Sequence, residues 1–281
     1  MKHVLLVGNG PNYFSQGISW ASVVRAAAKR AGLANQTEKV IKEPLPLVYE
    51  TVAARQTSSE SHAKNELANQ MRLLKPNDIH RQLMKIGWNT ILTTNYDHCL
   101  EEADGRKFIA ANLASETTYS VFRRRQFGTR SVWHIHGDFS RPRTMMLGMH
   151  HYCGYIQKLR RYLTTRPESP FVFGDSNSIE SGRHSWADLF LRDHVHIAGL
   201  GLGYEELLLW WLLGYKYRLK HKERLGCGDT TYYFMGTIKP SNKGRLELLL
   251  AYGVKIKHIP SSSGLPTLDT WSKLVRILKA T

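Results

Sequence analysis

Short apolar runs recur along this chain, and they constrain the fold more than any other feature of the sequence. The runs are rich in β-branched and aromatic residues, are followed by turn residues, and alternate with helical patterns, as strands of an α/β fold do. Most are continuously apolar, which indicates strands buried on both faces of a parallel sheet. Six strands are expected: His3–Val7, Thr90–Thr94, Ser131–Ile135, His194–Gly199, Thr231–Met235 and Val254–Ile259.

Helical patterns fill the intervals between these runs. The expected helices are Ile18–Ala31, Ser59–Leu74, one capped by Asp78, Met149–Leu163, Tyr204–Lys222, Ser241–Tyr252 and Asp269–Leu278. Strand alternating with helix predicts a Rossmann-like α/β fold with a doubly wound parallel sheet of about six strands. Residues 36–76 and 141–183 fit this alternation poorly. We expect one domain over residues 1–281, with these two segments inserted as a helical cap.

Composition narrows the class of protein. A chain of 281 residues can form one sizeable α/β domain with an insertion. The longest apolar run, which begins at Leu207, is shorter than the roughly 20 residues of a membrane span. The start of the chain lacks the pattern of a secretory signal. Three scattered cysteines, Cys99, Cys153 and Cys227, indicate a reducing compartment and cannot form a four-cysteine zinc site. A cytoplasmic protein with no membrane contact is therefore expected.

The net charge of +16 is the compositional outlier. A basic surface attracts polyanions and anionic small ligands. It fits contact with DNA, an acidic protein partner, or simply a solvated surface. The basic clusters, such as Arg123–Arg125, lack the interleaved aromatic residues of a single-strand stacking platform. The charge alone does not choose among these alternatives.

A glycine turn follows the first strand. Gly8, Asn9 and Gly10 lead toward the first helix, and Asn12 follows closely. Glycines at such a junction let the backbone approach a pyrophosphate, although they also occur in ordinary tight turns. The full G-x-G-x-x-G spacing of a dehydrogenase is missing. A nucleotide-binding loop and a plain turn both remain open.

Polar side chains follow the second and fourth strands as well. Thr94, Asn95 and Asp97 come after the second strand, where Asn95 can hold a water or a ribose hydroxyl and Asp97 can accept from a carboxamide. The alternative is that Asn95 or Asp97 caps the next helix. Gly199 and Gly201 follow the fourth strand and offer a second place where backbone can meet a nucleotide.

Two histidines end the third strand. His134 and His136 are expected to share one face of the strand, with His136 as a candidate general base and His134 as a buried structural residue. Metal ligation is the rival interpretation, through partners such as His150 and His151 or His194 and His196. No known metal-binding spacing supports it, so no metal is expected.

These motifs, in this order, resemble the sirtuin superfamily, particularly the bacterial sirtuin-like domains of antiphage defence systems. That family has a Gly-Ala-Gly loop, a Thr-x-Asn-x-Asp strand end, a His-Gly pair and a glycine-bearing strand end before a helix. The corresponding segments here are Gly8–Gly10, Thr93–Asp97, His136–Gly137 and Gly199–Gly203. The zinc module of the deacetylating members is absent, and Asn9 and Asn12 stand where the family has Ala and Ser.

The resemblance implies a function and roles for the site residues. Gly8 and Gly10 would cradle the pyrophosphate of NAD, and Asn95 would place the water or ribose. Asp97 would contact the nicotinamide carboxamide, and His136 would be the base. The remaining residues expected to line the nucleotide are Asn9, Asn12, Thr94, Gly199 and Gly201.

An NAD glycohydrolase is therefore expected, which yields ADP-ribose and nicotinamide as the effector of an antiphage system. The resemblance also implies a switch through a homo-oligomer or a helicase-like ATPase partner. Two alternatives remain: a non-catalytic module that binds a nucleotide or DNA, and an NAD-dependent deacylase or ADP-ribosyltransferase.

Overall fold

The structure is a computed structural model. It describes residues 1–15, 25, 28–29, 32, 37–40, 43–55, 60–112, 119–164, 185–223 and 225–281. The predicted helix Ile18–Ala31 lies mostly outside these residues, as does much of the predicted insertion 141–183. None of the helices in the described part combines the length and the apolarity that crossing a membrane requires.

A single eight-stranded sheet forms the centre of the described chain. Its strands are β1 (His3–Val7), β2 (Thr90–Thr93), β3 (Phe108–Asn112), β4 (Arg124–Phe127), β5 (Arg130–His134), β6 (His194–Ala198), β7 (Thr230–Met235) and β8 (Lys255–Ile259). They lie in the order β3-β4-β5-β2-β1-β6-β7-β8. All six predicted strands are present, each within one residue of its predicted start or end, and they pair in parallel.

The two strands that the sequence did not reveal are β3 and β4. They pair antiparallel with each other, and β4 pairs antiparallel with β5 across the turn at Gly128. The sequence of β4 is Arg-Arg-Gln-Phe, so it lacks the apolar run that identified the other strands. The expected count of about six was therefore too low, because an edge hairpin does not need two buried faces.

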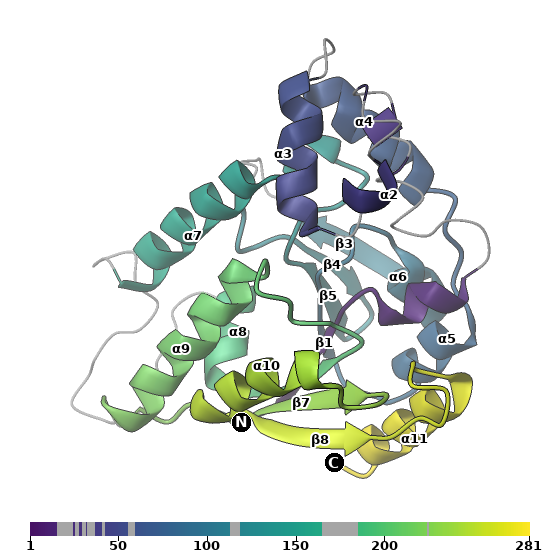
Figure 1. Ribbon diagram of the computed structural model, residues 1–281. Helices are drawn as coiled ribbons and strands as arrows, with labels where there is room; N and C mark the ends of the chain where they lie inside the picture. The colour runs from purple at the N-terminus through teal and green to yellow at the C-terminus, as the bar shows by residue number, and fades with distance from the viewer. Residues whose placement is uncertain are drawn as a thin grey trace.

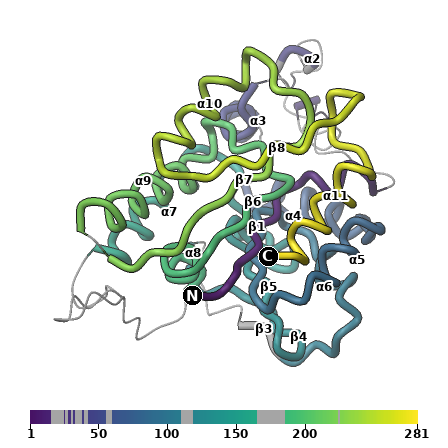
Figure 2. The backbone as a smooth tube through the Cα atoms, turned by 90° about the horizontal axis from the view of Figure 1, so that it is seen from below, coloured from purple at the N-terminus to yellow at the C-terminus, as the bar shows by residue number. Residues whose placement is uncertain are grey.

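Helices cover both faces of the sheet (Figure 1). One face packs against α7 (Met149–Thr164), α8 (Trp186–Arg192), α9 (Leu207–His221) and α10 (Pro240–Ala251). The other face packs against α5 (Asp78–Met84), α6 (Cys99–Asp104) and α11 (Leu268–Lys279). Figure 2 shows the sheet between these two layers, with β3 and β4 at one edge and β8 at the other.

The pattern of burial in β1 explains why its sequence is continuously apolar. Val4 and Leu6 are fully buried in the cluster on the α7–α9 side, whereas Leu5 and Val7 are buried in the cluster on the α5–α11 side. A strand at the centre of a doubly wound sheet has no solvent face, so both sets of alternate positions must be apolar.

The predicted helix over Ser59–Leu74 is present as α4 (Glu60–Met71), and the residue that caps α5 differs from the prediction. The cap of α5 is Asn77, whose side-chain oxygen accepts from the backbone N–H of Ile79 and of His80. Asp78 is instead the first helical residue and pairs with Arg81. Both residues suit an N-cap chemically, and only the backbone geometry distinguishes them.

The two predicted insertions meet each other over the sheet. The described part of the first comprises α2 (Thr37–Val40), α3 (Leu45–Arg55) and α4. Helix α4 contacts the 3₁₀ turn η3 (Pro142–Thr144) of the second segment, and α3 contacts α7. Helices α2, α3 and α4 stand together at the top of Figure 1, with α7 to their left and lower down.

Candidate functional site

The predicted site residues gather at the carboxyl ends of the central strands. Counted in chain order, the six parallel strands lie as 3-2-1-4-5-6, so the strand order reverses between β1 and β6. Ligands of open α/β sheets bind in the crevice at this reversal. The glycine turn after β1, the polar motif after β2, the histidines of β5 and the glycines after β6 all lie along this rim.

The glycines after β1 and β6 cross at very short range. Backbone N–H groups of Gly8 and Gly10 donate to the carbonyls of Ala198 (3.0 Å) and Gly199 (2.7 Å). A Cβ on Gly8 would lie 2.6 Å from the carbonyl oxygen of Gly199, and one on Gly10 would lie 2.8 Å from the Cα of Gly199. Packing between the two loops therefore requires glycine here, independently of any ligand.

Gly199 and Gly201 differ in their surroundings. Gly199 has a φ of +63°, and a Cβ there would lie 2.6 Å from the ring of Trp271 on α11. Gly201 is exposed, and a Cβ on it would meet no atom within 4 Å. Gly201 is thus the predicted glycine at which a ligand has room to approach. The predicted contact between Gly8, Gly10 and a pyrophosphate stays a prediction.

Asn12 links the glycine turn to the motif after β2. Its side-chain N–H₂ donates to the side-chain oxygen of Asn9 and to Oδ2 of Asp97, each at 2.8 Å. The other carboxylate oxygen of Asp97 accepts from the backbone N–H of Cys99, at the start of α6. Asp97 thus supports the helix start and holds Asn12. The Oδ1 atom of Asn12 is buried with no hydrogen-bond partner among the described residues.

Asn95 is fixed beside the glycine turn. Its side-chain amide donates to the carbonyl of Gly8 at 3.2 Å, and its backbone N–H donates to the Thr93 hydroxyl at 3.1 Å. Thr93 and the backbone N–H of Thr94 both bond the carbonyl of Val7. These bonds attach the end of β2 to the end of β1, and Asn95 is held at their junction.

His134, the last residue of β5, and His136, in the turn after it, lie on different sides of the sheet, contrary to the prediction. His134 contacts Glu101 of α6, whereas the ring of His136 packs edge-on against Tyr152 of α7. Strand β5 ends at His134, so the alternation of faces no longer holds at His136. The turn is fixed at Gly137, which has a φ of +112° and would place a Cβ 2.3 Å from the carbonyl of Thr144.

His136 faces an acidic residue that the sequence analysis did not single out. Its Nε2 lies 3.5 Å from a carboxylate oxygen of Glu206, and neither atom has a hydrogen-bond partner in the described chain. Burial lowers the pKa of His136 to about 3. Burial, with a smaller contribution from Glu205, raises the pKa of Glu206 to about 8. Both groups are therefore uncharged at neutral pH.

The loop between β6 and α9 carries Glu206 across the rim. β6 lies three strand positions from β5, a separation of roughly 14 Å at about 4.8 Å per strand. The loop closes this gap because the carboxylate of Glu206 reaches His136. Leu202, in the middle of the loop, is fully buried at a φ of 46°, a conformation that costs a branched residue free energy. Strain of this kind persists where surrounding contacts enforce it.

A charged network lies beside this uncharged pair. The Nε2 of His134 bonds Glu101 at 2.6 Å, and its Nδ1 donates to the carbonyl of Asn95. Although burial opposes protonation, the Glu101 carboxylate raises the pKa of His134 to about 9. The Arg125 guanidinium lies 3.9 Å from Glu101 and 3.8 Å from Asp138. Two cations thus compensate two buried carboxylates.

Asp138 completes that network. Its Oδ1 accepts from the Nε2 of His98 at 2.9 Å and from the backbone N–H of Ser140 at 2.7 Å. Burial opposes its ionisation, yet the bond from His98 and the charge of His134 hold the pKa of Asp138 well below its usual range. Asp138 therefore orders the turn after β5 as a carboxylate.

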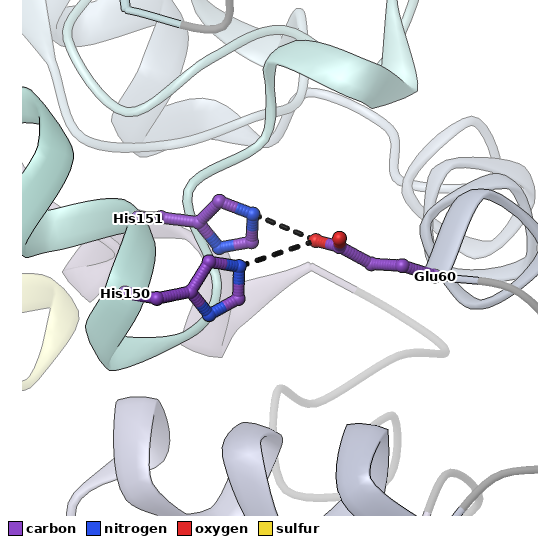
Figure 3. Close-up of side chains that lie close together, drawn as sticks. All are labelled: Glu60, His150 and His151. Carbon is purple, nitrogen blue, oxygen red and sulfur yellow. Dashed lines mark ion pairs between the residues drawn. The ribbon is translucent and has the colours of Figure 1, made fainter.

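Two groups of side chains in the described residues have ligand atoms close enough for a metal ion. One is Glu60 with His150 and His151 (Figure 3), and the other is His98 with His134 and Asp138. In the first, Nδ1 of His151 accepts two backbone N–H bonds, from Leu147 and Gly148. Its Nε2 lies 2.7 Å from the Glu60 carboxylate and 2.7 Å from the Nζ of Lys64, which is itself 3.1 Å from Glu60. The Lys64 amine therefore already occupies the place that a metal ion would take.

The second group fits a metal no better. His134 uses both ring nitrogens as donors, and Arg125 already supplies positive charge to Asp138. The donor chemistry of both groups thus favours internal hydrogen bonding over metal ligation. The other pairing considered, with His194 and His196, forms a separate cluster with His3 in β1 and β6.

The residues that the sequence analysis missed share one property: their partners are distant in the chain. Arg125 lies on the unrecognised strand β4, and Glu101 lies inside α6. Glu206 directly follows Glu205 at the start of α9, so the sequence offered both acids without distinguishing them. The sequence feature that could have pointed to Glu206 is the pair of acidic residues that follows the glycine-rich end of the fourth predicted strand.

Comparison with known families agrees with the motifs at this rim. A family profile described as a SIR2-like domain matches residues 89–174. This stretch contains the Thr93–Asp97 motif, the His136 turn, and strands β2 to β5. The match supports the sirtuin-like resemblance of this part of the chain. No curated protein matches the chain.

The close crossing of the two glycine loops predicts unequal effects of two alanine substitutions. Gly8→Ala should lower the free energy of unfolding by about 1–3 kcal/mol, because its Cβ would press on the backbone of the β6 loop. Gly201→Ala is the matched control and should change it by less than about 0.5 kcal/mol, since its Cβ would lie in open space. Urea unfolding measures both, and equal effects would contradict the crossing.

The raised pKa of His134 predicts a loss of stability at alkaline pH. A group whose pKa is higher in the folded state than in the unfolded state stabilises the folded protein most when it is protonated in both states. For His134 this stabilisation is complete below the unfolded pKa of about 6.5 and is lost as the pH rises through 9. We expect a loss on the order of 3 kcal/mol between pH 7 and pH 10 from this group.

Two variants isolate this contribution from the thiols and tyrosines that titrate in the same range. Glu101→Gln should flatten the slope of unfolding free energy against pH, because the imidazolium loses its partner. Glu102→Gln, on the exposed side of the same helix, should keep it. A wild-type slope in Glu101→Gln would show that the pair is not ionised as described.

Proposed function

We propose that this chain is an NAD glycohydrolase, which cleaves NAD to ADP-ribose and nicotinamide. The observation that carries the proposal is the convergence of Asn12, Asn95 and His136 at the strand-order reversal of a doubly wound sheet. Asn12 Oδ1, His136 Nε2 and a carboxylate oxygen of Glu206 are buried there without partners among the described residues. Unpaired buried polar atoms are costly, and a polar ligand would satisfy them.

The parts of NAD match the polar groups along the rim. The β1–β6 crossing is where a dinucleotide lies in sheets of this topology, with Gly201 and its neighbours open to a pyrophosphate. Asp97 and the free oxygen of Asn12 offer adjacent acceptors for the carboxamide N–H of nicotinamide. Asn95 lies between this region and His136, where the ribose would sit.

Cleavage at this site makes few chemical demands. Nicotinamide leaves NAD as a neutral molecule, so its departure needs no general acid. The transition state is oxocarbenium-like, as in glycoside hydrolysis. The protein must hold the ribose and place a water that loses a proton as it attacks. Asn95 and the neutral imidazole of His136 are suited to hold that water or a ribose hydroxyl.

The sirtuin-like resemblance supports a biological setting, which we include in the proposal. The chain would act as the NAD-depleting effector of a bacterial antiphage system, in the cytoplasm. An enzyme of this kind would be silent until a homo-oligomer forms or a helicase-like ATPase partner engages it. The net charge of +16 would suit an acidic partner or DNA.

Nicotinamide release from NAD by the purified protein tests the proposal. His136→Ala and Asn95→Ala should each reduce the rate by about 10²–10⁴-fold, which is the range for groups that position or move a proton. His134→Asn is the structural control, and any loss of its activity should follow its loss of stability. Release should be followed by chromatography, because ADP-ribose and nicotinamide must appear in equal amounts.

The outcome also separates the alternatives. Binding of NAD or ADP-ribose without release, in the presence of candidate partners as well, would favour a binding module. DNA affinity that falls steeply with salt would point to a nucleic-acid role. ADP-ribose transferred to a protein or an acyl group removed from lysine would favour the transferase or deacylase alternative.

A further inference from the structure

Glu206 is an acidic residue at the rim, directly beside His136. It occupies the cap position of α9 but forms no capping hydrogen bond with its side chain. Its side chain is 15% exposed, that of His136 is 3% exposed, and their facing atoms both lack partners in the described chain. Two unpaired polar atoms that face each other in a buried place indicate a shared ligand atom.

The distance between His136 and Glu206 allows one oxygen atom to form a hydrogen bond with both side chains. At 3.5 Å the Nε2 of His136 and the carboxylate oxygen of Glu206 are too far apart for a good direct hydrogen bond. An oxygen placed to one side can lie at about 2.8 Å from both atoms, which are ordinary hydrogen-bond lengths. A water or a ribose hydroxyl has the donors and acceptors to complete such a triangle.

Among the described residues, no cation lies against Glu206. The groups that interact with it electrostatically are Glu205 next to it, His136 after β5, Tyr96 after β2 and Tyr152 on α7. The imidazole is neutral, and both tyrosines keep their protons because burial raises the pKa of each hydroxyl. An ionised Glu206 would thus have a strong affinity for a proton, whereas His136 would have a weak one.

We propose that Glu206 is a catalytic residue of this site, which holds the attacking water together with His136 and takes its proton. This rests on the proposed NAD cleavage. The glycosidic bond breaks, and its electron pair leaves with nicotinamide. The water oxygen bonds to the ribose carbon, and its proton passes to the Glu206 carboxylate. Glu206 then releases this proton to solvent, which balances NAD⁺ and water against ADP-ribose, nicotinamide and H⁺.

In this assignment His136 positions the water and Glu206 accepts the proton. A carboxylate with a pKa near 8 is matched to proton transfer at neutral to mildly alkaline pH. Release of nicotinamide should therefore rise with pH through about 8. This pH dependence distinguishes the assignment from one in which His136 is the base, since burial keeps His136 unprotonated over that whole range.

The first experiment compares nicotinamide release by wild type, Glu206→Gln and Glu205→Gln from pH 5.5 to pH 9.5. Glu206→Gln should lose about 10²–10⁴-fold in rate and its pH dependence. Glu205→Gln is the matched control: it should keep a sigmoidal profile, with the midpoint moved to lower pH because one negative neighbour is gone. A Glu206→Gln enzyme with the wild-type rate and profile would overturn the proposal. Thermal unfolding checks that both variants fold.

The second experiment does not depend on turnover. ADP-ribose carries at C1′ the oxygen that hydrolysis adds, so its hydroxyl should lie where the water is held. Calorimetry should show binding to wild type that weakens about fivefold between pH 6.5 and pH 9, as protonated Glu206 loses its donated hydrogen bond. Glu206→Gln should bind equally at both pH values, and Glu205→Gln should still weaken with pH, with its midpoint at lower pH than in wild type.

The two experiments separate failure of this proposal from failure of the function. Suppose that Glu206→Gln keeps the wild-type affinity for ADP-ribose or the wild-type rate of nicotinamide release, with the wild-type pH dependence. The role of Glu206 is then overturned, and the proposed function stays intact. A wild type that neither binds ADP-ribose nor releases nicotinamide overturns both.

Discussion

The close crossing of the backbone after β1 and after β6 is the constraint on which the rest of the site depends. Gly8 and Gly10 lie against Gly199 at distances that leave no room for a Cβ, and two backbone hydrogen bonds close the contact. This contact sets where the loop after β6 begins. Trp271 of α11 packs on Gly10 and Gly199, so the layer behind the sheet also supports the crossing. Asn95, which bonds the carbonyl of Gly8, takes its place from it.

From that crossing the loop after β6 reaches over the ends of β1 and β2 to His136, in the turn after β5. Its path is held by Tyr232, whose hydroxyl bonds the carbonyl of Leu200, and by Trp210, whose ring N–H bonds the carbonyl of Gly203. This path requires buried Leu202 to adopt a left-handed backbone conformation, which costs free energy. The result is a pairing of His136 with Glu206 that neither strand could produce alone.

The ionisable side chains at this rim lie in two different environments, one with partners of opposite charge and one without them among the described residues. Beneath the site, His134 and Arg125 lie against Glu101 and Asp138, and these partners raise the pKa of His134 and lower that of Asp138. Above it, neither His136 nor Glu206 has a charged partner of opposite sign in the described part of the chain, and burial makes both neutral. Burial opposes protonation of both histidines, but only His134 has a carboxylate in hydrogen-bond contact, and this contact outweighs burial.

Much of this could be predicted from the sequence, because strands buried on both faces must be apolar throughout. Strand β1 was predicted to the residue, and the motifs at strand ends were placed on one rim. The polar edge strand β4 could not be found this way, and it brings Arg125. The faces of His134 and His136 depend on where β5 ends, which periodicity does not reveal. The choice between Glu205 and Glu206 depends on the backbone path through Leu202, which no local pattern encodes.

The central claim is that the rim at the β1–β6 crossing holds a dinucleotide with its ribose against His136 and Glu206. A crystal structure of the protein with ADP-ribose tests it most directly. A ribose oxygen should lie within about 3 Å of both His136 Nε2 and the Glu206 carboxylate, with the pyrophosphate near Gly201. ADP-ribose bound elsewhere, with the His136–Glu206 pair unoccupied in the same crystal, would contradict it.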